Sequence, residues 1–199
     1  MMPPFAERSH EKMQEVLMDP SASGPRVHYY MIRGGTDKRN ITTWESGTVG
    51  GEYIKTYGHY HVGDLDETYW VIFGEGIVLL QKRKKDESGN PIDDAISEFY
   101  AVQMHAGEDI FIPSEYGHLM LNTGSTWLVT ADDSPVNFGE VDAVSLPGHA
   151  DYLPVQKMQG FAYYVVEENG EPKLVRNHKY SEAPEAKIIS LAEYKLLAK

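Results

Sequence analysis

The sequence predicts a mainly β fold, a barrel or sandwich of short strands. Between about residues 26 and 166, short runs rich in β-branched and aromatic residues alternate with turn signals at close intervals. Such a pattern is typical of antiparallel sandwiches and barrels. The strands we expect cover residues 26–32, 42–47, 52–57, 67–73, 76–83, 97–105, 109–112, 117–122, 126–131 and 161–167.

The two ends of the chain differ from this central region, which we expect to span residues 26–178. Residues 1–25 form an N-terminal extension with a loosely helical pattern over 5–18, stopped by Asp19-Pro20. Residues 179–199 form a tail that ends in an amphipathic helix. Its apolar members are Ile189, Leu191, Tyr194, Leu196 and Leu197. Residues 132–159 are rich in loop signals, and a loop of that length usually has a functional or interface role.

The composition narrows the class of protein. At 199 residues and 41% hydrophobic content, the chain fits one globular domain with terminal additions. It contains no cysteine, which excludes disulfides and thiolate zinc sites. The net charge of −12 argues against a nucleic-acid partner. No apolar run approaches the length of a membrane span, and no signal peptide is evident, so we expect a cytoplasmic protein with no membrane partner.

A first motif carries candidate metal ligands. His59 and His61 are two residues apart, so on a strand they point to the same face. Glu67 opens a run with strand character, and the intervening Val-Gly-Asp-Leu-Asp can turn the chain. We therefore expect His61 and Glu67 to face each other across a hairpin.

A second motif follows about fifty residues later. Gly107 gives a turn, Pro113 ends a short strand, and His118 and Asn122 then share one face of the next strand. If the two motifs lie on neighbouring strands, three imidazoles and one carboxylate converge. Such a set suits a divalent transition metal such as iron, nickel, manganese or zinc.

The two motifs resemble those of the cupin superfamily, which implies a double-stranded β-helix, or jelly-roll barrel, with short peripheral N- and C-terminal helices. Two departures from the family pattern are visible. The gap before Glu67 is one or two residues longer than usual, which makes Asp64 and Asp66 rival ligands. Glu115 also replaces the glycine that often follows Pro113.

A closer resemblance is to the cupin-type glucose-6-phosphate isomerase family, first known from archaea. Residues 42–81, with Thr-Tyr-Gly-His-Tyr-His, and residues 160–170, with Glu-Glu-Asn-Gly, look like that family, as does the 113–122 motif. The resemblance covers roughly residues 26–178. In the Gly-His-x-Asp-Tyr element an extra Ala150 shifts Tyr152 by one residue, and the preceding 132–147 stretch is longer than in the family.

The resemblance implies a role for each matching residue in interconverting glucose 6-phosphate and fructose 6-phosphate, within glycolysis and gluconeogenesis. Glu67 and His118 would be catalytic, and one divalent metal per subunit, iron before nickel, manganese or zinc, is implied together with a homodimer. The implied metal ligands are His59, His61, Glu67 and His118. The implied substrate residues are Thr42, Thr56 and Gly58 for the phosphate, and Tyr69, His149 and Tyr152 for the sugar.

Two other functions remain open at this stage. The same ligand set serves cupin dioxygenases, where open metal positions bind oxygen and an organic chelate. A non-catalytic sugar-binding cupin is the third possibility. For an isomerase, the motifs leave open whether hydrogen moves through an enediol, with Glu67 as base, or by a hydride shift.

Overall fold

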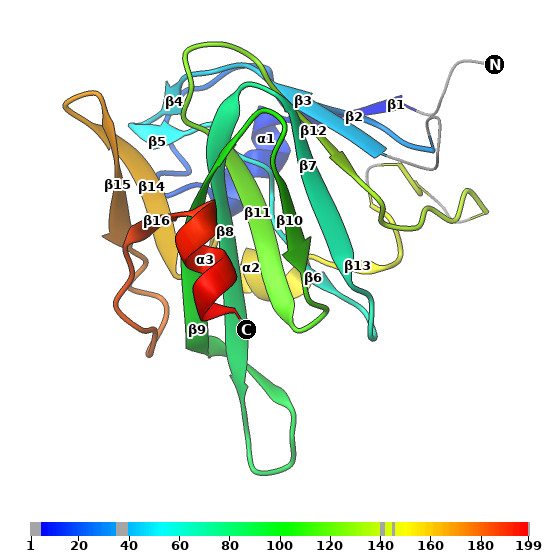
Figure 1. Ribbon diagram of the computed structural model, residues 1–199, viewed down its shortest axis with the longest axis vertical. Helices are drawn as coiled ribbons and strands as arrows, with labels where there is room; N and C mark the ends of the chain where they lie inside the picture. Colours follow the sequence, from blue (N-terminus) through cyan, green and yellow to red (C-terminus); the bar gives the residue numbers. More distant parts are fainter. Residues whose placement is uncertain (1–4, 35–39, 140–141, 145, 199) are drawn as a thin grey trace.

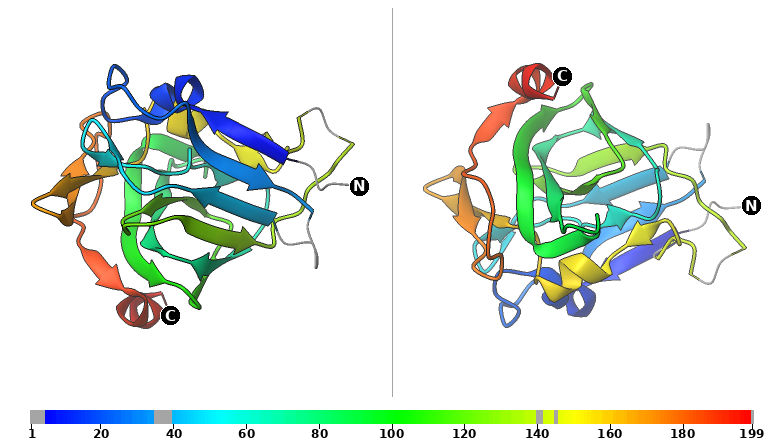
Figure 2. Two further views of the ribbon diagram at one scale, coloured as in Figure 1. Left: turned by 90° about the horizontal axis from the view of Figure 1, so that it is seen from above. Right: turned by 90° about the horizontal axis from the view of Figure 1, so that it is seen from below.

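The computed structural model describes residues 5–34, 40–139, 142–144 and 146–198 (Figure 1). Parts of the expected N-terminal extension, the 132–159 loop and the C-terminal tail fall on residues 1–4, 140–141, 145 and 199, and these lie outside the described residues. Two sheets, antiparallel except for one parallel strand at an edge, face each other and enclose the core, as the mainly β prediction requires. Figure 2 shows them end-on, with β1 beside β2 on the outside of the barrel.

The first sheet has six strands. In spatial order they are β1 (Phe5–Ser9), β2 (Val27–Ile32), β3 (Asn40–Trp44), β12 (Leu128–Asp132), β7 (Glu67–Phe73) and β10 (Asp109–Ile112). Every neighbouring pair is antiparallel. The register places Asn40, Asp132 and Tyr69 side by side across β3, β12 and β7, and Thr42 lies beside Thr130. These rows form one wall of the interior.

The second sheet supplies the opposite wall. Its order is β11 (Tyr116–Asn122), β8 (Glu75–Lys85), β9 (Pro91–His105) and β16 (Ile188–Ser190), with β16 parallel to β9. On its free side, β11 is extended by residues 55–61. Lys55 bridges Leu121, His59 bridges His118, and the segment ends in β6 (Tyr60–His61). β6 also pairs with the short strand β13 (Ala150–Asp151).

The chain alternates between the two sheets as it advances. The first sheet contains β3, β7, β10 and β12. In the chain these strands alternate with residues 55–61, β8 and β11, which belong to the second sheet. This winding is the jelly roll, or double-stranded β-helix, so the predicted fold class is confirmed. A small outer sheet is added by β4 (Thr48–Val49), β5 (Glu52–Tyr53), β14 (Tyr163–Glu168) and β15 (Glu171–Arg176).

The two sheets bury apolar side chains against each other. Trp44 and Val71 from the first sheet, and Val78, Leu80 and Met120 from the second, are 1% exposed or less. Burying side chains of this size contributes about 1.5–3 kcal/mol each. This packing fixes the strands whose polar residues form the candidate site.

The termini differ in part from expectation. The predicted loose helix over residues 5–18 is wrong for Phe5–Ser9, which is strand β1 paired with β2. Helix begins only at α1 (His10–Met13), where the Ser9 hydroxyl accepts a hydrogen bond from the Lys12 amide, and a 3-10 turn, η1 (Gln14–Val16), follows. The strand forms because β2 offers an open edge, a non-local partner that helical periodicity does not reveal.

The C-terminal helix is present but shorter than predicted. Ile189 lies in β16, and α3 (Leu191–Leu197) starts after Ser190, whose hydroxyl accepts from the Glu193 amide. α3 packs beside β9 (Figure 2). The 132–159 region contains β13 and the short helix α2 (Leu153–Lys157). No helix within the described residues is long and apolar enough to cross a membrane.

Candidate metal centre

The backbone brings His59 and His118 together. The His59 amide donates to the His118 carbonyl over 3.2 Å, and the His118 amide donates to the His59 carbonyl over 3.0 Å. Gly58 precedes them with a φ of +82°, and a Cβ there would lie 3.0 Å from the Phe161 ring and 3.2 Å from Leu119. Only glycine adopts this conformation in so tight a space without strain. The two imidazole rings end with their centroids 4.5 Å apart.

His61 and Glu67 meet differently from the prediction. The expected hairpin is wrong, because β6 lies beside β11 whereas β7 belongs to the opposite sheet. Residues 62–66 therefore cross between the walls, and Glu67 faces the histidines across the interior. Of the rival ligands, Asp66 accepts the Ser114 amide over 2.9 Å and Asp64 is exposed, so neither carboxylate joins the group.

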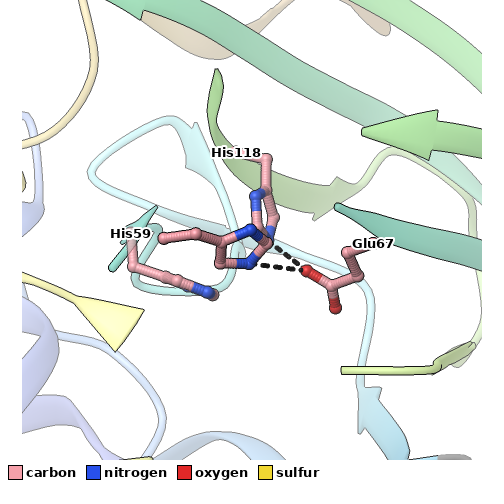
Figure 3. A group of neighbouring side chains, drawn as sticks. His59, Glu67 and His118 are labelled. Atoms are coloured by element: carbon pink, nitrogen blue, oxygen red, sulfur yellow. Dashed lines mark ion pairs between the residues drawn. The ribbon is translucent and has the colours of Figure 1, made fainter. Parts of the chain in front are cut away.

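The four predicted ligands converge on one point. One potential ligand atom from each of His59, His61, Glu67 and His118 lies within 4.8 Å of the other three. His61 Nε2 and His118 Nε2 are each 3.1 Å from Glu67 Oε2. Figure 3 shows His59 and His118 directed toward the same space as the Glu67 carboxylate. The four side chains that strand geometry selects in the sequence are therefore the four that the fold brings together.

The converging atoms lack hydrogen-bond partners. Among the described residues, seven buried side-chain polar atoms have none, and five of these belong to His59, His61, Glu67 and His118. His61 Nδ1 donates to the Leu65 carbonyl over 2.6 Å, so in the neutral ring Nε2 keeps its lone pair and faces the cluster. Buried polar groups are ordinarily paired. Three imidazoles and a carboxylate left unpaired in this way fit a divalent transition metal.

The pKa shifts of Glu67 and His59 favour the protonation states that a bound cation needs. Burial would raise the pKa of Glu67, but His118 and His61 outweigh it and hold that pKa below its usual range. Burial, assisted by the charge of His118, lowers the pKa of His59 well below its ordinary value. An ionised carboxylate beside a neutral imidazole is the state that metal binding needs.

A cavity adjoins the cluster, and every predicted substrate residue lines it. Its space is about 40 Å³, enough for a few water molecules and well below the volume of ordinary ligand pockets. The lining includes the predicted residues Thr42, Thr56, Gly58, His59, Glu67, Tyr69, His149 and Tyr152.

Donors are available at the end of the cavity formed by Thr56 and Gly58. The Thr56 hydroxyl oxygen accepts the Met120 amide over 3.0 Å, which leaves its proton free to point elsewhere. The Gly58 amide donates to no acceptor among the described residues. Hydroxyl and amide donors of this kind bind anions without requiring a net positive surface.

Tyrosine hydroxyls also face the cavity in protonated form. Burial, with the charge of Glu67, raises the pKa of Tyr69 well above its ordinary value. Burial, with Tyr29, raises the pKa of Tyr152 to about 12. The Tyr69 ring lies 5.1 Å from His118 and the Tyr152 ring 5.3 Å from His59, measured between centroids. Both phenols are therefore donors beside the candidate metal.

Sequence reasoning missed several residues of the cavity wall. Arg33 and Asp132 line it, with Arg33 Nη1 3.3 Å from Asp132 Oδ2. Asp132 Oδ1 accepts from Asn40 Nδ2 and from the Ser134 hydroxyl, each over 2.6 Å. Burial and the charge of Glu67 raise the pKa of Asp132 to about 7. Asp132 could have been identified from its position opposite Tyr69 at the end of β12, but only the strand register reveals that position.

A family model and curated relatives indicate the same family. A family model described as glucose-6-phosphate isomerase matches residues 30–185. The glucose-6-phosphate isomerase of Thermococcus onnurineus is 33% identical over 135 residues, covering 67% of this chain and 59% of that protein. The Pyrococcus abyssi enzyme of the same name is 32% identical, with 67% and 59% covered. The chain thus matches about 59% of the length of these relatives.

Proposed function

Since the chain belongs to the glucose-6-phosphate isomerase family, we propose that it interconverts glucose 6-phosphate and fructose 6-phosphate as a metal-dependent aldose–ketose isomerase. Such an enzyme serves glycolysis and gluconeogenesis. The observation that carries the proposal is the convergence of four unpartnered donor atoms beside a cavity that also holds Thr56 and Gly58. A centre that stabilises developing charge serves the chemistry at C1 and C2, and donors for a phosphate would hold the sugar beside that centre.

We propose His59, His61, Glu67 and His118 as the ligands of one divalent metal per subunit, iron before nickel, manganese or zinc. Imidazole and carboxylate ligands accept all four. When bound, the metal would polarise the substrate carbonyl and stabilise the oxyanion that develops during the reaction.

The substrate phosphate would bind at the Thr42, Thr56 and Gly58 end of the cavity. Two hydroxyls and a backbone amide would donate to its oxygens, and the Gly58 backbone can approach closely because it carries no Cβ. Tyr69, His149 and Tyr152 would then line the sugar. The raised pKa values of Tyr69 and Tyr152 support these roles, since each phenol keeps a proton that it can donate to a sugar oxygen.

Glu67 would carry the proton between C2 and C1 of the open-chain sugar. Its low pKa keeps the carboxylate ionised, which is the form that can accept a proton. His118 would hold it in place, since His118 Nε2 lies 3.1 Å from Glu67 Oε2. Exchange of solvent deuterium into the substrate at C2 distinguishes this enediol route from a direct hydride shift, which brings in no solvent hydrogen.

We further propose a homodimer located in the cytoplasm. A row of exposed aromatic side chains on the outer face of the first sheet supports an interface with a second copy. Phe5 and Phe73 are more than half exposed, and Tyr30 lies between Phe5 and Trp127 with ring centroids 6.0 and 6.4 Å apart. Exposed apolar patches of this kind mark interaction surfaces, and light scattering during gel filtration measures the resulting mass.

One experiment tests the isomerase proposal. Protein stripped of metal should not convert fructose 6-phosphate in a coupled assay, and each divalent metal restored in turn should return activity to a different degree. Oxygen consumption measured in parallel tests the dioxygenase alternative. If no metal restores turnover of either sugar phosphate while the protein still binds them, the isomerase proposal fails and the non-catalytic sugar-binding function takes its place.

A further inference from the structure

Arg8 is a buried cation beside the cavity, on a strand outside the residues that the family model matches. It lies in β1 and is 4% exposed, whereas the match begins at residue 30. Its guanidinium carbon is 5.6 Å from the centroid of the Tyr29 ring, 5.7 Å from that of Tyr57 and 5.8 Å from that of Tyr152. All three tyrosines line the cavity. Arg8 therefore contacts the site from behind its aromatic wall.

A specific hydrogen bond connects Arg8 to the Thr56–Gly58 end of the cavity. Arg8 Nε donates to the Tyr29 hydroxyl oxygen over 2.9 Å, and the Tyr57 amide donates to the same oxygen over 3.3 Å. The Tyr29 hydroxyl thus lies against the backbone between Thr56 and Gly58.

These two donors determine what the Tyr29 hydroxyl can do. A phenol oxygen that accepts two N–H groups must direct its own proton elsewhere. Within the described residues that proton meets no acceptor, and Tyr29 faces the cavity. A hydrogen bond from a charged donor also strengthens the next bond along the chain. Arg8 therefore orients the Tyr29 hydroxyl proton toward the cavity and strengthens Tyr29 as a hydrogen-bond donor.

Charge supports the same conclusion. The protein carries a net charge of −12, so a dianionic ligand must be held by cations placed locally. Of the two arginines described at this cavity, Arg33 faces Asp132. Glu15, the carboxylate near Arg8, is bound by Lys12 and by the Tyr57 hydroxyl. Arg8 brings its guanidinium directly to the Tyr29 hydroxyl through the hydrogen bond from Nε.

We propose that Arg8 is a positioning residue for phosphate, acting through the Tyr29 hydroxyl so that the N-terminal strand completes the substrate site. The proposal rests on the proposed function, because the phosphate belongs to the sugar phosphate. It extends that function to a part of the chain that the family match does not include.

Inorganic phosphate is the probe, titrated into the metal-loaded protein by calorimetry. Arg8→Met should weaken phosphate binding about tenfold, the lower end of the value of a hydrogen bond to a charged group. Arg8→Lys should stay within about threefold of the wild type. Arg26→Met is the matched control, because Arg26 is an exposed arginine of the same region that pairs only with Glu7 among the described ion pairs, and it should change nothing.

Tyr29→Phe separates positioning from mere packing. It should weaken phosphate binding as much as Arg8→Met does, and the double variant should lose no more than either single one, since both act along one path. A purely structural Arg8 would lower the melting temperature in both Arg8 variants and leave the phosphate affinity unchanged, which overturns the proposal. Should Arg8→Met not fold, Arg8→Lys and Tyr29→Phe still decide it.

Fructose 6-phosphate turnover distinguishes this proposal from the proposed function. In the isomerase, Arg8→Met should raise KM by about tenfold and leave kcat nearly unchanged. Arg8-dependent phosphate binding by a wild type that converts no sugar phosphate supports the Arg8 role and rejects the isomerase. A wild type that binds no inorganic phosphate overturns the Arg8 role.

Discussion

Two buried polar clusters lie on the inner face of the barrel. One leaves its polar atoms without hydrogen-bond partners, and the other pairs them. In the candidate metal centre, the inward nitrogens of three histidines and one oxygen of Glu67 have no hydrogen-bond partner. In the network around Asp132, Asn40 and Ser134 donate to one carboxylate oxygen and Arg33 faces the other. The two clusters are neighbours, since Asp132 pairs with Tyr69, two residues from Glu67.

This difference in hydrogen bonding indicates that the first cluster binds a ligand and that the second stabilises the fold. A buried polar group without a partner costs about 1–3 kcal/mol, so the candidate metal centre carries a penalty that a bound cation would remove. The Asp132 network carries no such penalty and holds β3, β12 and the residues after β2 together. Variants in the first cluster should therefore change ligand binding, and variants in the second should change stability.

The largest effect is expected at the histidines. His59→Ala, His61→Ala and His118→Ala should each weaken metal binding by more than ~100-fold. Removing a residue that only hydrogen-bonds a ligand can already cost that much, and these variants remove the ligand itself. Turnover should disappear with the metal while the far-ultraviolet circular dichroism persists. Metal content after dialysis, measured by mass spectrometry, checks this, with the exposed His105→Ala as control. Full metal retention in all three variants would contradict the site.

Glu67→Gln should separate binding from proton transfer within the same cluster. The amide keeps the size and one oxygen donor but cannot accept the substrate proton. If Glu67 carries the proton, the variant should retain substantial metal and lose turnover by about a hundred- to ten-thousand-fold, along with deuterium exchange at C2. Parallel loss of metal and activity, both restored by excess metal, would show that Glu67 serves only as a ligand.

Asp132→Ala should show the opposite behaviour. It removes the carboxylate that accepts from Asn40 and faces Arg33, although each keeps a backbone carbonyl as acceptor, so the free energy of unfolding should fall by about 1–3 kcal/mol. Metal affinity should change less than threefold. Urea unfolding and metal titration measure the two quantities, and Asp132→Asn, which keeps an acceptor oxygen, should lose less stability. A selective loss of metal in Asp132→Ala would make the network part of the metal site.

A smaller, pH-dependent effect is expected at a partly buried pair of histidines, His10 and His28. His10 Nε2 lies 3.0 Å from the Ala22 carbonyl, so Nε2 carries the proton of that ring. His10 Nδ1 therefore accepts a hydrogen bond from His28 Nε2 over 2.8 Å. His28 Nδ1 has no hydrogen-bond partner among the described residues. Burial, with His10 and Lys55, lowers the pKa of His28 from 6.5 to about 4. The fold thus requires the neutral ring.

The direction of the effect follows from that lowered pKa. The stability that neutral His28 contributes is complete above pH 6.5 and is lost as the pH falls toward 4. At about 1.4 kcal/mol per pKa unit, the loss reaches about 3 kcal/mol. Urea unfolding at pH 7 and pH 4.5 should show part of it in the wild type and less in His28→Gln. An equal pH dependence in both proteins would remove His28 as the cause.

The strands and the four candidate metal ligands could be predicted because both depend on local sequence. A spacing of two residues fixes the shared face of His59 and His61, and β-branched and aromatic runs mark the strands. The predicted substrate residues that line the cavity came instead from the family resemblance, since no local pattern marks them.

The features that could not be predicted depend on pairing between distant segments. β1 forms because β2 offers an edge, and Glu67 meets His61 because residues 62–66 cross between sheets. Arg8 and Asp132 reach the site only through the register of strands far apart in the chain. No local pattern encodes such a register, so composition and spacing leave these residues unmarked.

The pairing of both chain ends has a consequence for solubility during folding. β1 covers the edge of β2, and β16 covers the edge of β9. An uncovered strand edge is a template for pairing with another chain, and so for aggregation. Barrels built from distant pairings also fold slowly, which prolongs the exposure of such edges. Loss of either terminal strand should therefore first appear as poor recovery of soluble protein, before any change in the metal centre itself.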